Sequence, residues 1–159
     1  MERNSRNFKR RVSVINGNAE AVCDLLHDDS ISSSFSNKSV VKEVFYPKFT
    51  TREHYDKCRD MTGNADTSNF GGLFSVTFVT NEASRAFFDA LACHKGPSLG
   101  TSFTLACPYT VLAHYNEMDW AQKYDVEEGL VRVSVGTEER ERLLDIFRQA
   151  LMAAKAQVK

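Results

Sequence analysis

The segment Gly129-Leu130-Val131-Arg132-Val133-Ser134-Val135-Gly136 is a short strand pattern with an arginine at its centre. Side chains alternate between the two faces of a strand, so the three valines share one face while Arg132 lies on the other. The valines can fill a core, and the guanidinium faces elsewhere. Because a guanidinium is planar, permanently charged and able to donate two parallel hydrogen bonds, its natural partner is a carboxylate or a phosphate. Two simpler interpretations stay open: an exposed arginine on an edge strand, or a structural ion pair.

The chain has a helical pattern near each of its two ends. Apolar residues between Phe8 and Leu26 recur every three or four positions, which predicts one long N-terminal helix with a single apolar stripe. After the arginine strand, Thr137 is expected to cap a final helix. The inward stripe of that helix comprises Leu143, Leu144, Phe147, Ala150, Leu151 and Ala154. Both terminal helices can therefore cover one face of a sheet.

Further strand patterns lie between the two terminal helices. The predicted strands cover residues 40–46, 72–79, 98–103 and 130–135. A short helix is expected over 52–59, and Asn81 is expected to cap a helix after the second strand. The predicted loops and turns cover residues 28–39, Gly63-Asn64 and 109–115. This alternation predicts a two-layer α+β domain with helices packed on one face of a small sheet.

The composition is that of a globular domain with one core. The chain has 159 residues, of which 42% are hydrophobic and 26% are charged, and its net charge is -1. This balance gives no electrostatic reason to expect nucleic acid or an anionic membrane as a partner. No apolar run approaches the ~20 residues that span a bilayer, and the basic N-terminus lacks the apolar segment of a secretory signal. We therefore expect a cytoplasmic protein.

The sequence holds no complete catalytic or metal-binding motif. There is no Gly-x-Ser-x-Gly, no His-Glu-x-x-His and no Walker loop. The four cysteines form no Cys-x-x-Cys pair, so we expect reduced thiols that serve in packing. His54 and Cys58 could share a helical face, with Cys93-His94 supplying two more ligands, but this spacing matches no familiar metal site. We expect no metal.

Several segments resemble, in the same order, the C-terminal part of the pyridoxal-phosphate-dependent trans-sulfuration enzymes. The most specific are Ser98-Leu99-Gly100 and the segment Gly129–Gly136. The others are Asn4-Ser5-Arg6-Asn7-Phe8, Ile15-Asn16, Asn18-Ala19-Glu20, Val44-Phe45-Tyr46-Pro47, Gly71-Gly72-Leu73-Phe74-Ser75-Val76 and Gly96-Pro97. The likeness covers nearly the whole chain except the serine-rich loop, and it is greatest to the fungal cystathionine γ-synthase-like members.

This resemblance implies the small C-terminal α+β domain of the fold-type I enzymes, with helices on one face of a mainly antiparallel sheet. It divides the chain into the end of a long interdomain helix (1–27) and a substrate-binding domain (28–159), with the large cofactor-binding domain absent. In the family, the arginine that matches Arg132 binds the α-carboxylate of the amino-acid substrate. The serine that matches Ser98 lines the same pocket, together with the backbone that follows it at Leu99.

The cofactor machinery of the family has no counterpart in this sequence. The family lysine that holds the cofactor as a Schiff base lies in a Ser-x-Thr-Lys context, and this chain has no Thr-Lys dipeptide. The phosphate cup and the side chains that contact the cofactor ring belong to the missing portion. The resemblance therefore implies pyridoxal 5'-phosphate in the complete enzyme. It also implies no catalytic or cofactor-binding residue in this chain, and no cofactor bound by it alone.

The resemblance implies a truncated or split form of an enzyme that catalyses γ-replacement on an activated homoserine by cysteine. An alternative is a non-catalytic interaction module that pairs with a complementary or full-length chain of such an enzyme, or forms a homo-oligomer. A nonfunctional remnant is a third hypothesis. The motifs do not separate synthase, lyase and sulfhydrylase chemistry, because all three kinds of enzyme share the carboxylate clamp.

Overall fold

The computed structural model describes residues 2–32, 39–58 and 70–158. Within these residues the centre is a five-stranded sheet with the strand order β1-β2-β5-β4-β3. The strands span Val41–Phe45 (β1), Leu73–Phe78 (β2), His94–Lys95 (β3), Leu105–Pro108 (β4) and Val131–Ser134 (β5). Neighbouring strands are antiparallel except β3 and β4, which are parallel. The strand that carries the arginine, β5, is therefore the middle strand of the sheet.

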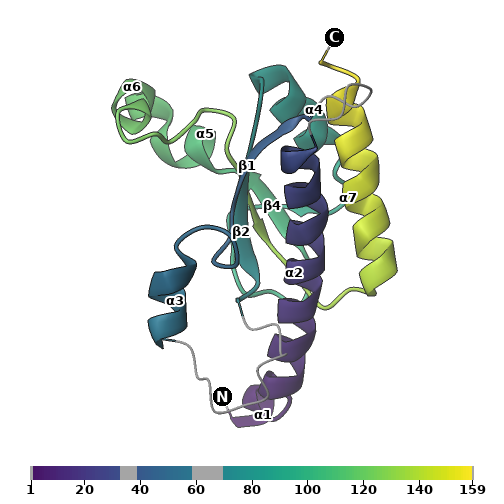
Figure 1. Cartoon of the computed structure of the whole chain (residues 1–159). Helices are drawn as coiled ribbons and strands as arrows, with labels where there is room; N and C mark the ends of the chain where they lie inside the picture. The colour runs from purple at the N-terminus through teal and green to yellow at the C-terminus, as the bar shows by residue number, and fades with distance from the viewer. Residues whose placement is uncertain (1, 33–38, 59–69, 159) are drawn as a thin grey trace.

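The three longest helices cover one face of the sheet. They are α2 (Phe8–Ile31), α4 (Asn81–Ala90) and α7 (Arg140–Lys155), and they lie together on one side (Figure 1). The shorter helical segments are α1 (Glu2–Ser5), α3 (Arg52–Cys58), α5 (Tyr109–His114), the 3-10 turn η1 (Tyr115–Glu117) and α6 (Met118–Gln122). Of these, α3, α5 and α6 project from the opposite side. The predicted α+β class is confirmed, with the long helices on one face of a mainly antiparallel sheet.

The core lies between the sheet and the long helices. Each of the three valines between residues 131 and 135 exposes 1% or less of its surface, as the alternation predicts. Phe147 of α7 packs against Phe74 of β2 and Phe87 of α4, with ring centroids 6.2 and 6.1 Å apart. Fully burying a phenylalanine side chain is worth roughly 1.5–3 kcal/mol. These aromatic contacts join two helices to the same face of the sheet.

The predicted strand at residues 98–103 is wrong. This segment is an irregular loop, and the strand β4 begins later, at Leu105. Gly100 has a positive φ of 71°, which favours glycine and is incompatible with an extended strand. The carbonyl of Ser102 accepts hydrogen bonds from the backbone N–H and the hydroxyl of Thr137, both at 2.9 Å. Contacts with the segment after β5, rather than a strand ladder, thus satisfy this backbone.

Two predicted helix caps are also wrong, and each true cap lies close by. The cap of α4 is Thr80, whose side chain accepts a hydrogen bond from the backbone N–H of Ala83, whereas Asn81 is already helical. The cap of α7 is Glu139, whose carboxylate accepts from two backbone N–H groups of the first turn. Thr137 instead donates to the loop that precedes β4. Both segments hold adjacent residues able to cap, so composition alone does not choose between them.

Two predicted loops are helical where the structure describes them. Helix α2 continues to Ile31, because the buried carboxylate of Asp29 accepts hydrogen bonds from the backbone N–H groups of Val40 and Val41. The segment 109–115 contains α5 rather than a loop. The predicted short helix over 52–59 is confirmed as α3. The predicted turn at Gly63-Asn64 and the serines at 33–36 lie outside the described residues.

The described residues include neither a membrane span nor a metal cluster. Across these ranges, no helix combines the length and the apolar character that crossing a bilayer requires. In the same part of the chain, no three His, Cys, Asp or Glu side chains gather in a way that could hold a metal ion. The cysteines Cys23, Cys58, Cys93 and Cys107 are free thiols.

Candidate functional site

Arg132 lies on the middle strand of the sheet, on the face opposite the long helices. Its register partners are Ser75 on β2 and Cys107 on β4, so a strand flanks it on each side. The interpretation as an edge-strand arginine is therefore wrong. A side chain on a central strand starts from a rigid backbone, which suits a group that must hold a ligand in a fixed orientation.

Two contacts from other segments fix the guanidinium. Its Nη2 donates a hydrogen bond of 2.7 Å to the carbonyl of Pro97. Its Cζ lies 4.8 Å from the centroid of the Tyr109 ring, in a cation–π contact. In the described part of the chain, no carboxylate oxygen lies within 4.0 Å of its nitrogen atoms, so these residues offer it no ion pair. The guanidinium is therefore oriented by neutral partners while its charge is left available.

The loop between β3 and β4 carries Ser98 and Leu99 and is anchored on both sides of them. Arg132 holds the carbonyl of Pro97 before them, and the Ser134 hydroxyl accepts a hydrogen bond of 3.1 Å from the backbone N–H of Gly100 after them. Both anchors are outward-facing residues of β5. The loop that resembles the family motif is thus attached directly to the strand that carries Arg132.

The side chains of Ser98 and Leu99 are exposed, and Leu99 shows 53% of its surface. Within the described residues the Ser98 hydroxyl makes no hydrogen bond. The structure therefore brings the backbone of this loop to Arg132, through Pro97, but does not bring the Ser98 hydroxyl into contact with the guanidinium.

A buried polar network holds the far end of the loop. Thr104 is fully buried; its hydroxyl donates to Glu138 at 2.9 Å and accepts from the backbone N–H of Gly136 at 3.0 Å. The other Glu138 oxygen accepts from the backbone N–H of Thr104. Asn18 of α2 donates to the carbonyls of Gly136 and Glu138 at 3.3 and 2.8 Å. Helix α2 is thereby linked to the loop through the turn after β5.

The backbone approach at this turn requires a glycine. A Cβ placed on Gly136 would lie 2.5 Å from backbone atoms of Phe103, a separation that neither segment can relieve by moving a side chain. The close contact brings the end of the loop down onto the turn after β5. Gly136 is also the last residue of the segment that carries Arg132. One short segment therefore supplies both the arginine and the glycine against which the end of the loop packs.

A hollow of about 310 Å³ adjoins the anchored loop. Leu99 and Ser134 line it on one side, and Phe8, Val12 and Ile15 of α2 line it on another. Ser134 shares a face of β5 with Arg132, but Arg132 itself is not among the residues that line this hollow. Its lining is largely apolar, and Arg11 and Asn16 of α2 add polar groups to it.

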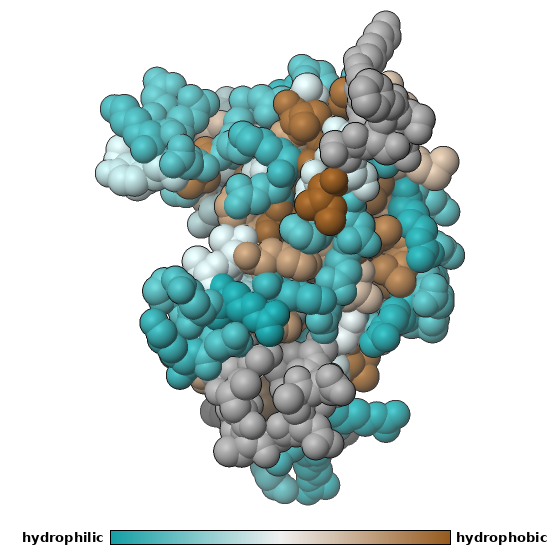
Figure 2. Space-filling view, viewed as in Figure 1, coloured by the Kyte–Doolittle hydropathy of each residue, from teal (hydrophilic) through white to brown (hydrophobic). Residues whose placement is uncertain are grey.

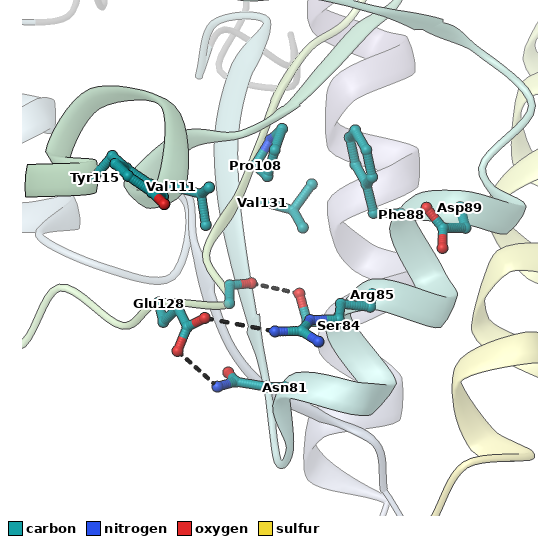
Figure 3. A pocket seen from close by; sticks show the side chains of 11 residues that line it. Asn81, Ser84, Arg85, Phe88, Asp89, Pro108, Val111, Tyr115, Glu128 and Val131 are labelled. Carbon is teal, nitrogen blue, oxygen red and sulfur yellow. Dashed lines mark hydrogen bonds and ion pairs between the residues drawn. The ribbon is translucent and has the colours of Figure 1, made fainter. Parts of the chain in front are cut away.

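A second hollow, of about 420 Å³, lies between α4 and α5 (Figure 3). Phe88, Pro108 and Val131 give it an apolar lining. Part of its polar rim is paired, because Glu128 accepts from Asn81 and forms an ion pair of 3.6 Å with a guanidinium from α4. Val131, on the helix-covered face of β5, lines this hollow, whereas Arg132 does not.

Four of the described lysines are engaged by other groups, and none of the described lysines lies in the hollow beside the anchored loop. A covalently held cofactor needs an amine beside the substrate-binding groups, and among the described residues no lysine lines the hollow beside Leu99 and Gly100. Burial lowers the pKa of Lys95, but its amine donates to the carbonyls of Phe88 and Leu91 at the end of α4. The other paired lysines are Lys42 with Glu127, Lys48 with Glu20 and Asp24, and Lys155 with Asp29. What the residues fit is an anion clamp.

The sequence analysis missed several residues that build the clamp. Tyr109 was placed in a loop, and no local pattern connects it with Arg132, because the contact depends on how β4 lies beside β5. Glu138 was not singled out from the sequence, whereas the structure shows that it accepts hydrogen bonds from Thr104. Ser134 could have been found, since strand alternation puts it on the same face as Arg132.

Comparison with known proteins gives a match over almost the whole chain. The family model described as Cys/Met metabolism PLP-dependent enzyme matches residues 5–152. The cystathionine gamma-synthase-like enzyme iboG2 of Amanita muscaria is 53% identical over 163 residues, which cover 98% of this chain and 26% of that protein. The cystathionine gamma-synthase of Neurospora crassa is 42% identical over 158 residues, covering 99% of this chain and 23% of that protein.

A solved structure shows the same fold. The cystathionine gamma synthase of Xanthomonas oryzae pv. oryzae, in complex with cystathionine, superposes with a TM-score of 0.77 at 27% identity. The match covers 98% of this chain and 38% of that one. The chain thus spans about a quarter of the length of the two fungal relatives and just over a third of the bacterial one.

Proposed function

The chain belongs to the Cys/Met metabolism PLP-dependent enzyme family, and from that premise we propose that it is the substrate-binding C-terminal part of a cystathionine γ-synthase-like trans-sulfuration enzyme. The observation that carries this proposal is the state of Arg132. Its guanidinium lies on the middle strand, is oriented by Pro97 and Tyr109, and has no carboxylate partner among the described residues. A guanidinium in this state is suited to bind an anion from solution.

The role of the clamp is to bind and orient an amino acid by its α-carboxylate. A carboxylate is planar and accepts two parallel hydrogen bonds from one guanidinium, which fixes both the position and the rotation of the substrate. The anchored backbone of Pro97–Gly100 forms the wall beside it. The hollow lined by Leu99, Gly100 and Ser134 adjoins this wall and can receive uncharged parts of the substrate.

Pyridoxal phosphate would supply the electron sink in the complete enzyme, where the expected reaction is γ-replacement on an activated homoserine by cysteine. No described lysine lines the hollow beside the anchored loop, and four are paired elsewhere, so we assign this chain substrate binding and no catalytic residue. Two names support the synthase type: the relatives from Amanita muscaria and Neurospora crassa are a cystathionine gamma-synthase-like enzyme and a cystathionine gamma-synthase.

The proposal is tested by titrating the chain with L-homoserine and, separately, with L-homoserine amide. The two ligands differ in whether they carry the α-carboxylate. NMR of the Arg132 side-chain Nε–Hε group should show a saturable shift with the acid and none with the amide. Equal shifts with both ligands, or no shift with the acid, would contradict carboxylate binding by Arg132.

A second test concerns the cofactor. Pyridoxal phosphate added to the chain alone should give no internal-aldimine absorbance, and borohydride reduction should leave no lysine modified at specific stoichiometry. A single lysine labelled at one equivalent would overturn the assignment of substrate binding without cofactor binding.

A second candidate function is a non-catalytic module that pairs with a complementary chain. Exposed apolar side chains on α2 favour it, because Phe8 and Ile31 show 56% and 64% of their surface. Figure 2 shows hydrophobic areas around α2 and beside α7 among hydrophilic residues. Light scattering coupled to size exclusion, with and without the N-terminal three quarters of a fungal relative, tests this function. A chain that stays monomeric in both samples would exclude it.

A further inference from the structure

Tyr109 occupies a position that connects three elements around the clamp. It is the first residue of α5 and follows Pro108, the last residue of β4. Its backbone N–H donates to the carbonyl of Leu130 at 3.0 Å, which ties it to the start of β5. The backbone that carries the ring is therefore fixed by a contact that does not involve Arg132.

The ring and the Pro97 carbonyl constrain the guanidinium in different ways. The carbonyl accepts from Nη2 and so fixes one edge of the group. The ring, whose centroid is 4.8 Å from Cζ, attracts the cation through its quadrupole. An arginine side chain loses considerable rotamer entropy when it becomes ordered, on the order of 2 kcal/mol. If the arginine is already ordered in the unbound chain, this entropy loss does not reduce the free energy of ligand binding.

Further aromatic side chains support the ring. His114 lies edge-on to Tyr109 with the ring centroids 5.9 Å apart, and Trp120 follows at 6.1 Å from His114. Tyr124 continues the series at 4.9 Å from Trp120. The contact between Tyr109 and Arg132 is therefore the inner end of a row of rings that runs through α5 and α6.

We propose that Tyr109 is a positioning residue, which holds the Arg132 guanidinium in the orientation that receives a planar carboxylate. This inference rests on the proposed function of Arg132 and adds the residue that prepares it. The chemistry that matters is the aromatic face. The phenol hydroxyl has no part in the contact with Cζ, so a phenylalanine can replace the tyrosine and an aliphatic side chain cannot.

The test compares Tyr109→Phe with Tyr109→Leu, because both remove the hydroxyl and the first keeps the ring. Affinity for L-homoserine should change less than about twofold in the phenylalanine variant and fall about three- to tenfold in the leucine variant. Tyr115→Leu is the matched control, because that tyrosine is 74% exposed and lies outside the row of rings, and this variant should bind like the unmodified chain. Equal affinities for Tyr109→Leu and the unmodified chain would overturn the proposal, as would equal losses in both Tyr109 variants.

A ligand-free measurement separates this inference from the proposed function. The heteronuclear NOE of the Arg132 Nε–Hε group reports its order without any carboxylate present. It should be high in the unmodified chain and in Tyr109→Phe, and low in Tyr109→Leu. Failure of the unmodified chain to bind L-homoserine would contradict the proposed function alone, whereas an ordered guanidinium in Tyr109→Leu would contradict the positioning role alone.

Discussion

The two faces of β5 are held by different kinds of contact. The valines on one face pack against α2, α4 and α7 in a continuous apolar core. On the other face, Arg132 and Ser134 make polar contacts with the loop between β3 and β4. The same strand thus contributes stability through one set of residues and a ligand site through the residues between them.

Because the two faces of β5 are held by different contacts, substitutions that lower stability and substitutions that weaken ligand binding should fall on different faces. Apolar packing is cooperative and non-directional, so a core substitution is felt across the whole domain. The clamp depends on a few directional contacts to Pro97, Gly100 and Tyr109. Substitutions on the helix-covered face should therefore lower stability, and those on the outer face should chiefly alter binding.

The largest effect is expected for Phe147→Ala. Its ring contacts those of Phe74 and Phe87, so removing it leaves a cavity between the sheet and two helices. The free energy of unfolding should fall by about 3–5 kcal/mol in urea denaturation followed by circular dichroism. Met152→Ala on the same helix is the control, because that side chain is 71% exposed and should cost less than about 0.5 kcal/mol. Similar losses in the free energy of unfolding for Phe147→Ala and Met152→Ala would contradict the assignment of stability to the helix-covered face.

An intermediate effect is expected for Thr104→Val, which keeps the shape of the side chain and removes its hydroxyl. The backbone N–H of Gly136 would lose its acceptor, and Glu138 would lose a donor. The cost should be about 1–3 kcal/mol, together with weaker binding of L-homoserine because the loop is released at one end.

The matched control for that substitution is Thr101→Val. The Thr101 hydroxyl donates to the carbonyl of Phe103 at an exposed position, so its loss should be close to neutral. An unchanged affinity in Thr104→Val, despite the lower stability, would show that the buried network does not position the loop.

The smallest effect concerns Glu139, the exposed cap of α7. Hydrogen bonds from the backbone N–H groups of Arg142 and Glu141 lower the pKa of its carboxyl below the ordinary 4.5. A carboxyl whose pKa is lower in the folded state stabilises the fold above its unfolded pKa, and this contribution is lost as the pH falls through the folded pKa. Thermal unfolding of Glu139→Gln should show a slightly lower Tm at neutral pH, with a difference that narrows in acid. A constant difference would contradict a role for the charge.

Sequence patterns predicted the helix-covered face well, because its signals are local. Period two identified the buried valines of β5, and helical spacing identified α2 and α7. The exact helix ends were harder to predict. Thr80 and Glu139, rather than the neighbouring residues Asn81 and Thr137, cap α4 and α7, and the spacing of residues in the sequence does not reveal this choice.

The outer face was harder to predict because its contacts join distant parts of the chain. The Ser134 hydroxyl meets the N–H of Gly100, and Arg132 meets Pro97, across 34 and 35 positions. The segment 98–103 resembled a strand, yet these contacts make it a loop. Arg132 itself could be singled out by its place in the alternation, and the family resemblance supplied its role as a carboxylate clamp. Its aromatic partner Tyr109 became visible when the structure placed β4 beside β5.

The most direct test of the central claim is the affinity of Arg132→Gln for L-homoserine. Arg148→Gln, which removes an exposed arginine from α7, serves as the control for a change in net charge. We predict that Arg132→Gln keeps the fold by circular dichroism and loses about tenfold or more in affinity, while Arg148→Gln binds normally. Undiminished binding by a folded Arg132→Gln variant would contradict the assignment of Arg132 as the carboxylate clamp.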